Sequence, residues 1–182
     1  MLQVTLVPLG AVENPLLEYL ALMIGETLRC EVSVESRQLS ADPAYDPLRR
    51  QHHSTRLLES LEKGWGEDAG KVLGVALQDL FIPILTFVFG EAQLGGRAAI
   101  ISIARLRQGF YGLPDDPALL YHRAEKEALH ELGHTLGLVH CPDYGCVMRF
   151  SNSVEEVDLK GERFCTSCAA RVEEAYAQGG TK

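Results

Sequence analysis

The order of hydrophobic and polar positions along this chain predicts strands and helices in alternation. Alternating or continuous apolar runs predict strands, and apolar residues spaced by three or four positions predict helices. The predicted strands are LQVTLVPL at 2–9, CEVSVESRQL at 30–39, KVLGVALQDL at 71–80, ILTFVFGEA at 84–92 and RAAIISIARL at 97–106. The predicted helices cover residues 14–28, 54–64, 117–137 and 166–178. This order favours an α+β fold, with helices packed on a mixed five-stranded sheet.

Two local signals mark where some of these elements begin or end. Asn14 is expected to cap the first helix, with Pro15 in its first turn. The QLGG segment at 93–96 is expected to form the hairpin turn between the last two strands. We read the polar segment 41–53 as a connection to the second helix.

Length and composition limit the classes of protein that this chain can belong to. Its 182 residues suit one domain, and 46% of them are hydrophobic. The net charge of −8 and the absence of a basic stretch exclude nucleic acid as the expected partner. The longest apolar run, at 80–89, is about half as long as a membrane span requires. We therefore expect a protein without a membrane partner. We also expect it to be a monomer.

The N-terminal sequence and the cysteines indicate the cytoplasm. MLQVTLVPLG has no positively charged start, and its apolar run is too short for a signal peptide. The five cysteines are an odd number, which argues against a disulfide framework, and cytoplasmic cysteines usually remain thiols or bind metal. Cys30, on a predicted strand, is interpreted as a small buried hydrophobe.

The strongest chemical signal is HELGHTLGLVHCPDYGCVM at 130–148, which holds three of the six histidines. His130 and His134 are one helical turn apart, so both ring nitrogens can reach one zinc ion at about 2.0 Å. On the helical wheel they lie opposite an apolar stripe, and we expect both imidazoles to face away from the core. The stripe consists of Tyr121, Ala124, Ala128, Leu132 and Leu136. We interpret His52, His53 and His122 as ordinary surface or core residues.

The extension of H-E-x-x-H to a third histidine makes a chance match improbable. Gly137 can adopt a positive φ, so it can end the helix and let His140 turn back toward His130 and His134. Three neutral histidines leave the fourth zinc position open for water, as in catalytic sites. Zinc lowers the pKa of that water, and Glu131 can accept its proton and pass it to the leaving group.

The remaining cysteines predict a second metal site. Cys141 and Cys146 form a C-x4-C pair, and Cys165 and Cys168 form a C-x-x-C pair. Together they can supply four thiolates to one closed, structural zinc site. An iron–sulfur cluster and redox-active thiols are the alternatives. The expected cofactors are thus two Zn²⁺ ions per chain, one catalytic and one structural.

These motifs resemble those of a known group of enzymes. HELGHTLGLVH followed by Met148 resembles the metzincin clan of zinc peptidases, in which this methionine makes a turn beneath the metal. Within the clan, Cys141, CVM at 146–148, FSNS at 150–153 and CTSC at 165–168 are similar to the archaemetzincins.

The resemblance implies a metzincin fold that forms one catalytic domain. An N-terminal lobe at 1–137 would contain the twisted mixed sheet, its helices and the active-site helix. A small C-terminal lobe at 138–182 would contain the third histidine, the four-cysteine zinc site, the Met-turn and the final helix. The archaemetzincin resemblance implies the same assignment of the four cysteines to a structural zinc.

The resemblance also points to a place where substrate would bind. In the clan, the fourth strand is the sheet edge along the cleft, where an extended peptide can add as a further strand. Here that strand is 84–92, and Gly90 to Gln93 are candidates for main-chain contacts with substrate. A buried strand is an equally good interpretation of residues 84–89.

One position departs from the pattern of the clan. Some members carry a tyrosine two residues after the methionine, which helps to hold the oxyanion. Phe150 occupies this place here and has no hydroxyl group. Tyr144 and Arg149 are near in sequence, but nothing in the sequence indicates that they reach the site.

Two functions are consistent with the sequence. The first is a zinc metallopeptidase that cleaves a peptide or protein substrate by attack of zinc-bound water, with Glu131 as general base. The second is a zinc-binding protein with little or no peptidase activity, which holds metal or a peptide. Glu131 favours hydrolysis, because binding alone does not require it, whereas Phe150 keeps the second function open.

Overall fold

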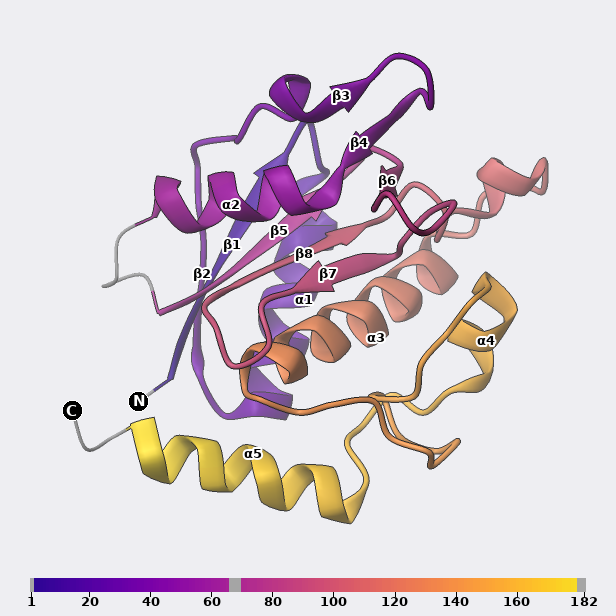
Figure 1. Ribbon diagram of the computed structural model, residues 1–182. Coiled ribbons are helices and arrows are strands. Elements are labelled where there is room, and N and C mark those ends of the chain that lie inside the picture. Colours follow the sequence, from indigo (N-terminus) through magenta and orange to yellow (C-terminus); the bar gives the residue numbers. More distant parts are fainter. Residues whose placement is uncertain (1, 66–69, 180–182) are drawn as a thin grey trace.

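The fold is built on a twisted mixed sheet (Figure 1). Within residues 2–65 and 70–179, which the computed structural model describes, this sheet has five strands in the order β2-β1-β5-β8-β7. Their bounds are Gln3–Leu9 for β1, Glu31–Val34 for β2, Lys71–Ala76 for β5, Gly90–Ala92 for β7 and Ala98–Ser102 for β8. All neighbouring pairs are parallel except β7 and β8, which are antiparallel. The predicted mixed sheet of five strands is confirmed.

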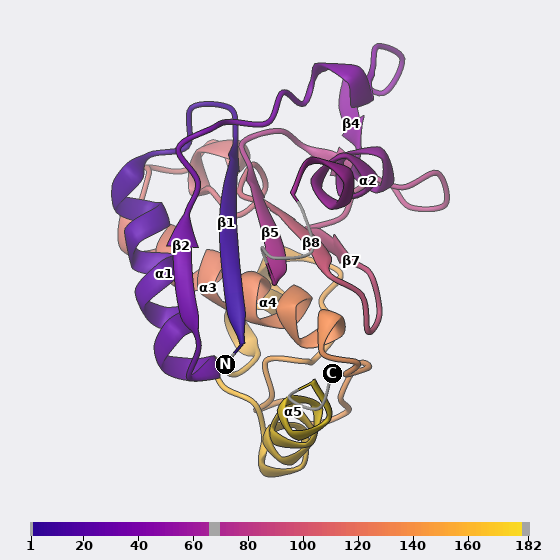
Figure 2. The same ribbon diagram turned by 90° about the vertical axis from the view of Figure 1, so that its left-hand side faces the viewer.

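Helices cover both faces of this sheet (Figure 2). Helices α1 (Asn14–Leu28) and α3 (Pro117–Thr135) pack on one face, and α2 (Ser54–Gly64) packs on the other. Along β5, Leu73 and Val75 join the cluster beneath α1 and α3, whereas Val72 and Ala76 join the cluster beneath α2. This alternation follows from the two-residue repeat of a strand.

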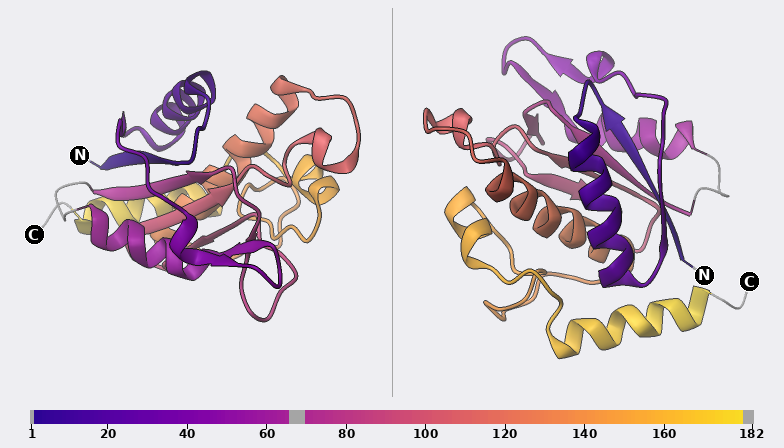
Figure 3. Two further views of the ribbon diagram at one scale, coloured as in Figure 1. Left: turned by 90° about the horizontal axis from the view of Figure 1, so that it is seen from above. Right: turned by 180° about the vertical axis from the view of Figure 1, so that it is seen from behind.

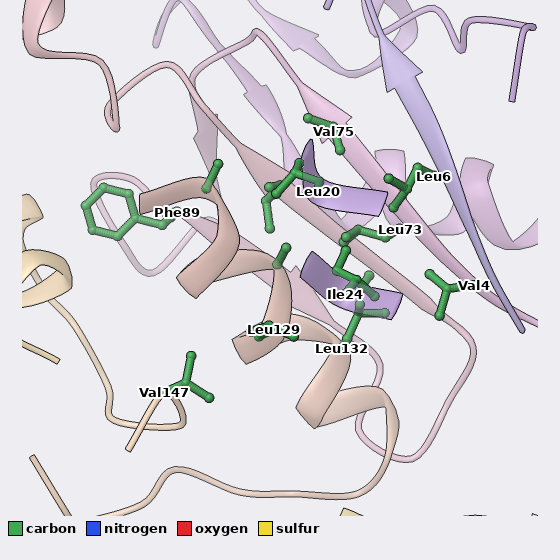
Figure 4. Packing of buried hydrophobic residues seen from close by; sticks show 14 of the residues in the cluster. Val4, Leu6, Leu20, Ile24, Leu73, Val75, Phe89, Leu129, Leu132 and Val147 are labelled. Carbon is green, nitrogen blue, oxygen red and sulfur yellow. The ribbon is translucent and has the colours of Figure 1, made fainter. Parts of the chain in front are cut away.

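The core between α1, α3 and the sheet positions the helix that carries the histidines. Figure 4 shows Leu20 and Ile24 of α1 and Leu129 and Leu132 of α3 gathered around Leu73. Burying each such side chain contributes about 1.5–3 kcal/mol to stability. The helix is therefore held against the sheet by packing over most of its length.

The chain after residue 138 covers the side of α3 that faces away from the sheet (Figures 1 and 3). This part includes α4 (Val154–Leu159) and α5 (Thr166–Gly179). Val147 and Val157 join the same core cluster as Leu129. Because α3 is enclosed from both sides, the prediction that both imidazoles face away from the core is wrong for His130, which is only 5% exposed.

Helices α1 and α2 have the predicted bounds, but two other local predictions are wrong. Residue Glu13 precedes α1 without a side-chain capping hydrogen bond, so Asn14 is the first helical residue and does not cap the helix. The predicted strand 84–92 is a strand only at 90–92, and the preceding residues form turns and a loop. Pro83 has no N–H to donate to a sheet, which is unfavourable within a strand.

A second, smaller sheet was not predicted from the sequence. The predicted strand 71–80 bends after β5 and resumes as β6 (Leu80–Phe81). Strand β6 pairs with β4 (Gln51–His53), which in turn pairs with β3 (Tyr45–Asp46). The polar segment 41–53 is thus more than a connection, because it contains both β3 and β4. These strands are two or three residues long, too short for a periodic pattern to reveal them.

The predicted ends of other strands and helices differ from those in the structure by a few residues. The strands predicted at 30–39 and 97–106 are shorter, and the helix predicted at 117–137 ends at Thr135. The turn at 93–96 joins β7 to the antiparallel β8, as predicted. A short 3-10 helix, Gln108–Tyr111, precedes α3. No helix in the described part of the chain is long and apolar enough to cross a membrane.

Gly133 lets Met148 approach α3 closely from the side opposite the sheet. A Cβ atom added to Gly133 would lie 2.4 Å from the sulfur of Met148, which is closer than these two atoms can approach each other. Met148 is fully buried. Met148 therefore packs against the helix that carries His130 and His134, at a residue without a side chain that makes room for it.

We predict that Gly133→Ala lowers the free energy of unfolding by about 1–3 kcal/mol, because the added methyl group overpacks the contact with Met148. Gly25→Ala in α1 is the matched control, since its Cβ would meet atoms no closer than 3.4 Å. Helix propensity alone would make that control more stable by up to about 1 kcal/mol. Denaturant unfolding of both variants measures the difference. Equal stabilisation by both substitutions would contradict the steric argument.

Candidate metal centres and active-site cavity

Three histidines converge at the C-terminal end of α3. The ring nitrogens of His130, His134 and His140 that could bind a metal lie within 4.8 Å of one another. The Nε2 atoms of His130 and His134 are 3.1 Å apart. Tetrahedral zinc with bonds of 2.0–2.1 Å places its ligands about 3.3 Å apart. The three histidines therefore fit one zinc ion, and they leave one tetrahedral position for another ligand.

The turn after α3 brings His140 back to the other two histidines. Gly137 has a φ of 89°, the left-handed conformation that the sequence predicts for it. The N–H of Leu138 donates to the carbonyl of Gly133 at 3.0 Å, and the N–H of Gly137 donates to that of His134 at 2.9 Å. This pair of bonds is the Schellman motif that ends many helices. The role expected of Gly137 in ending the helix is confirmed.

Backbone carbonyls orient two of the three imidazole rings. His130 Nδ1 lies 2.9 Å from the carbonyl oxygen of Val147, and His134 Nδ1 lies 2.7 Å from that of Leu138. A proton on Nδ1 that is donated to a carbonyl leaves the Nε2 lone pair free for a metal. Burial lowers the pKa of His130 well below its usual value, and it lowers those of His134 and His140 as well. All three rings are thus favoured in the neutral form that binds metal.

Glu131 is buried beside the histidines and lies against the edge of the sheet. A Cβ atom on Gly90 would be 2.6 Å from Cγ of Glu131, so only glycine at this position of β7 leaves room for the carboxylate. Burial raises the pKa of Glu131 well above its usual value, the charge of Glu127 raises it further, and Lys160 opposes the increase. A carboxyl group with a raised pKa is suited to accepting and returning a proton.

A cavity of about 490 Å³ opens onto both the histidines and Glu131. Strand β7 forms part of its wall through Gly90, Glu91 and Ala92. Because β7 is the last strand of the five-stranded sheet, the expected sheet edge along the cleft is confirmed. Residues 85–89 also line the cavity, as a loop rather than the buried strand that was the alternative.

Glu91 attaches this sheet edge to α2. Its carboxylate accepts hydrogen bonds from the hydroxyl groups of Ser54 and Thr55, the latter at 2.9 Å. Both hydroxyl groups belong to the first turn of α2. The short strand β7 is therefore held by side-chain bonds to α2 on one face of the sheet and by pairing with β8 along one edge, and its other edge stays open to the cavity.

The four cysteines predicted to bind metal form a second group. The sulfurs of Cys141, Cys146, Cys165 and Cys168 lie within 4.8 Å of one another. Those of Cys141 and Cys165 are 3.8 Å apart, and tetrahedral zinc with bonds of 2.3 Å places sulfurs about 3.8 Å apart. A disulfide would require about 2.05 Å. These sulfurs fit one tetrahedral metal ion, and all four cysteines are free thiols.

Cys30 lies outside this group. Its thiol is half-buried against the main core, near the carbonyl of Ile24. Burial raises the pKa of this thiol to about 11, so it stays protonated at neutral pH. The interpretation of Cys30 as a small packing residue is consistent with these contacts.

One short segment joins the two groups of candidate ligands. The sulfur of Cys146 accepts a hydrogen bond from the N–H of Cys165 at 3.4 Å, within the cysteine group. The next residue is Val147, and its carbonyl oxygen is the hydrogen-bond partner of Nδ1 of His130. The carbonyl of Met148 accepts from the N–H of Cys141 at 3.0 Å. Movement of the cysteine group would therefore displace the partner of His130.

Three residues near the Met-turn do not supply a hydroxyl group to the histidines. The ring of Phe150 packs against His140, with ring centres 4.9 Å apart. Tyr144 and Arg149 stack on each other, and neither lines the cavity. The other histidines lie outside both metal groups among the described residues, as expected, and they are His52, His53 and His122.

Sequence reasoning assigned no role to several polar residues that line the cavity, among them Glu127, Ser151 and Lys160. Glu127 precedes Glu131 by four residues, so helical spacing alone places the two on one face of α3. Lys160 lies near Glu127 only because α4 folds back onto α3. No local pattern in the sequence indicates that contact.

Known proteins share this sequence and this fold. The family model described as peptidase family M54 matches residues 10–174. An archaemetzincin from Methanocaldococcus jannaschii is 43% identical over 174 residues, which cover 95% of this chain and 94% of that protein.

Solved structures agree with the sequence comparison. The crystal structure of an archaemetzincin from Methanopyrus kandleri matches with a TM-score of 0.85 and 37% identity, covering 97% of this chain and 96% of that one. That of an archaemetzincin from Archaeoglobus fulgidus, complexed with malonate, matches with a TM-score of 0.81 and 37% identity, covering 93% and 99%. The chain therefore belongs to peptidase family M54, the archaemetzincins, which are zinc-dependent metallopeptidases.

Proposed function

We propose that this peptidase cleaves peptide bonds in the cavity beside His130, His134 and His140, with Glu131 as general base and acid. The observation that supports this most directly is the position of Glu131, buried next to three converging imidazoles and lining the same cavity. Zinc, when bound by the three histidines, supplies a Lewis acid that polarises a carbonyl group and lowers the pKa of water.

The carboxylate of Glu131 would move the proton during hydrolysis. It would accept a proton from the attacking water and deliver it to the nitrogen of the leaving amine. Its burial and the neighbouring charge of Glu127 support this role, because both raise its pKa toward the range needed for proton return. The alternative of a zinc-binding protein without peptidase activity is not favoured, since membership of the family indicates hydrolysis.

The edge of β7 is the proposed place for the main chain of the substrate. In the described part of the chain, β7 pairs with β8 on one side only and lines the cavity on the other. An extended peptide can add to such an edge through main-chain hydrogen bonds. We propose that residues Gly90 to Gln93 make these contacts, next to Glu131.

We further propose that Cys141, Cys146, Cys165 and Cys168 hold a second, structural zinc ion. Support comes from the spacing of the sulfurs and from the N–H of Cys165, which donates to Cys146. Such a site stabilises its surroundings because metal binding contributes directly to folding. It would hold Val147 in place, and through Val147 it would orient His130.

We propose that lobes at 1–137 and 138–182 form one catalytic domain, supported by the single core cluster that joins Leu129 to Val147. We propose a monomeric, cytoplasmic enzyme that acts on peptides or proteins and does not bind nucleic acid. The free thiols support the cytoplasm, and the net charge of −8 argues against nucleic acid as a partner.

We expect Glu131→Gln to lower the rate of peptide hydrolysis by about 10²–10⁴-fold, because glutamine cannot accept a proton from water. Zinc content and the unfolding midpoint should change little, since the amide fills the same space. The measurement is digestion of a peptide library by zinc-loaded protein, with a chelator-treated sample as a blank. Glu59→Gln, whose side chain is 60% exposed on α2, is the control and should cleave at the native rate. Equal rates for the native protein and Glu131→Gln would refute the proposed role.

We expect the native protein to contain two zinc ions per chain and Cys165→Ser to contain about one. The loss of a thiolate opens the four-cysteine site, so the melting temperature should also fall. Elemental analysis and thermal unfolding measure these two effects. Cys30→Ser is the matched control, because its sulfur lies outside the cysteine group and zinc content should remain at two. One zinc in the native protein and an unchanged count in Cys165→Ser would contradict the two-site proposal.

A further inference from the structure

A buried ion pair forms part of the wall of the active-site cavity. Lys160 Nζ lies 2.7 Å from Oε1 of Glu127, and the two side chains are only 1% and 5% exposed. Both residues line the cavity that contains the histidines, and so does Ser151. In the proposed hydrolysis Glu127 and Lys160 act only through the effect of their charges on the pKa of Glu131, and Ser151 has no part. The hydrogen-bonding groups that these residues place in the wall therefore require another explanation.

The polar atoms of these residues have unused hydrogen-bonding capacity. Apart from the ion pair, neither Lys160 Nζ nor Oε1 of Glu127 has a hydrogen-bond partner among the described residues. The buried hydroxyl oxygen of Ser151 has none either. An ammonium group has three donors, and a hydroxyl group can donate and accept. Because buried polar groups are nearly always fully paired, the unpartnered hydroxyl of Ser151 and the donors of Lys160 that the ion pair leaves unused indicate a polar ligand in this part of the cavity.

The ion pair is not needed to attach α4 to α3. Arg123 of α3 makes two hydrogen bonds of 2.7 Å to the carboxylate of Asp158. Lys126, also on α3, donates to the carbonyls of Val157 and Asp158 at 3.1 and 3.0 Å. These contacts hold α4 without Lys160, which follows its last residue.

The pair lies on the leaving-group side of the reaction centre. Glu127 precedes Glu131 by four residues, which places it about 6 Å away along the axis of α3. Glu131 returns a proton to the leaving amine, so the residue that follows the cleaved bond lies nearest to Glu131. Its side chain can enter the part of the cavity walled by Glu127, Ser151 and Lys160.

We propose that Glu127, Lys160 and Ser151 form a specificity subsite for a substrate residue with a carboxamide side chain, glutamine or asparagine, directly after the cleaved bond. This inference rests on the proposed hydrolytic function and names its substrate class. The carbonyl oxygen of the amide accepts a hydrogen bond from Lys160, and its NH₂ group donates to Glu127. Ser151 can serve either end of the amide. A single neutral group thus satisfies both members of the ion pair.

Other side chains fit this subsite less well for electrostatic reasons. A carboxylate would be attracted by Lys160 but repelled by Glu127 and Glu131, and it would also lose its hydration. An ammonium group would meet Lys160 and the metal held by the histidines. An apolar side chain would remove water from three polar atoms without replacing their hydrogen bonds. The cation Lys160 and the anion Glu127 lie side by side, so the matching ligand is a neutral amide, which both accepts and donates hydrogen bonds.

The test uses binding, so it does not depend on turnover. Four peptide hydroxamates, which anchor on zinc, would carry glutamine, leucine, glutamate or lysine at the position after the metal-binding group. Calorimetry on the zinc-loaded native protein should give at least about tenfold tighter binding of the glutamine probe than of each of the others. In the double variant Glu127→Leu/Lys160→Met the leucine probe should bind best. Replacement of a buried ion pair by apolar residues of similar volume often preserves folding.

The control variant separates recognition from stability. Lys126→Met removes a lysine from the same helix pair, but this residue does not line the cavity. It should lower the melting temperature and leave the order of the four affinities unchanged. Equal binding of the four probes, or preference of the native protein for leucine, glutamate or lysine, would overturn the inference and leave the hydrolytic function intact. Failure of all four probes to bind zinc-loaded protein would refute both the subsite and the open zinc site on which it depends.

Discussion

The hydrogen bond between His130 Nδ1 and the carbonyl of Val147 is the interaction on which the candidate active site depends. It orients a ring on α3 by means of a segment that follows the helix in sequence and covers it in space. The same segment carries Cys146 in the cysteine group and Met148 against Gly133. Sheet, helix and C-terminal segment must therefore all be in place before three imidazoles can point at one ion.

Enclosure of α3 explains the unusual electrostatics of this site. Glu127, Glu131 and Lys160 are buried side chains that line one cavity, where water cannot fully solvate their charges. Burial and the charge of Glu127 raise the pKa of Glu131, and Lys160, which pairs with Glu127, opposes this increase. Burial that would be costly for a single charge is tolerated in this combination. It leaves a carboxyl group suited to proton transfer next to metal ligands that are neutral.

The edge of the sheet meets this buried helix at a single small residue. Gly90 allows β7 to approach Glu131 more closely than any side chain would permit. The residues before it form a loop along the cavity instead of extending the strand. Binding surface and proton-transfer group are consequently adjacent, although they come from parts of the chain about 40 residues apart.

Much of the chemistry was determined by local sequence, because the relevant residues are close along the chain. The spacing of His130, Glu131 and His134, the positive φ of Gly137 and the bounds of α2 follow from helical geometry over a few residues. Tertiary structure decided which face of α3 is buried, where the strand predicted at 84–92 breaks, and that Lys160 meets Glu127. These features depend on segments that pack against each other from distant positions. Their energies arise from long-range burial and pairing, which a local pattern does not contain.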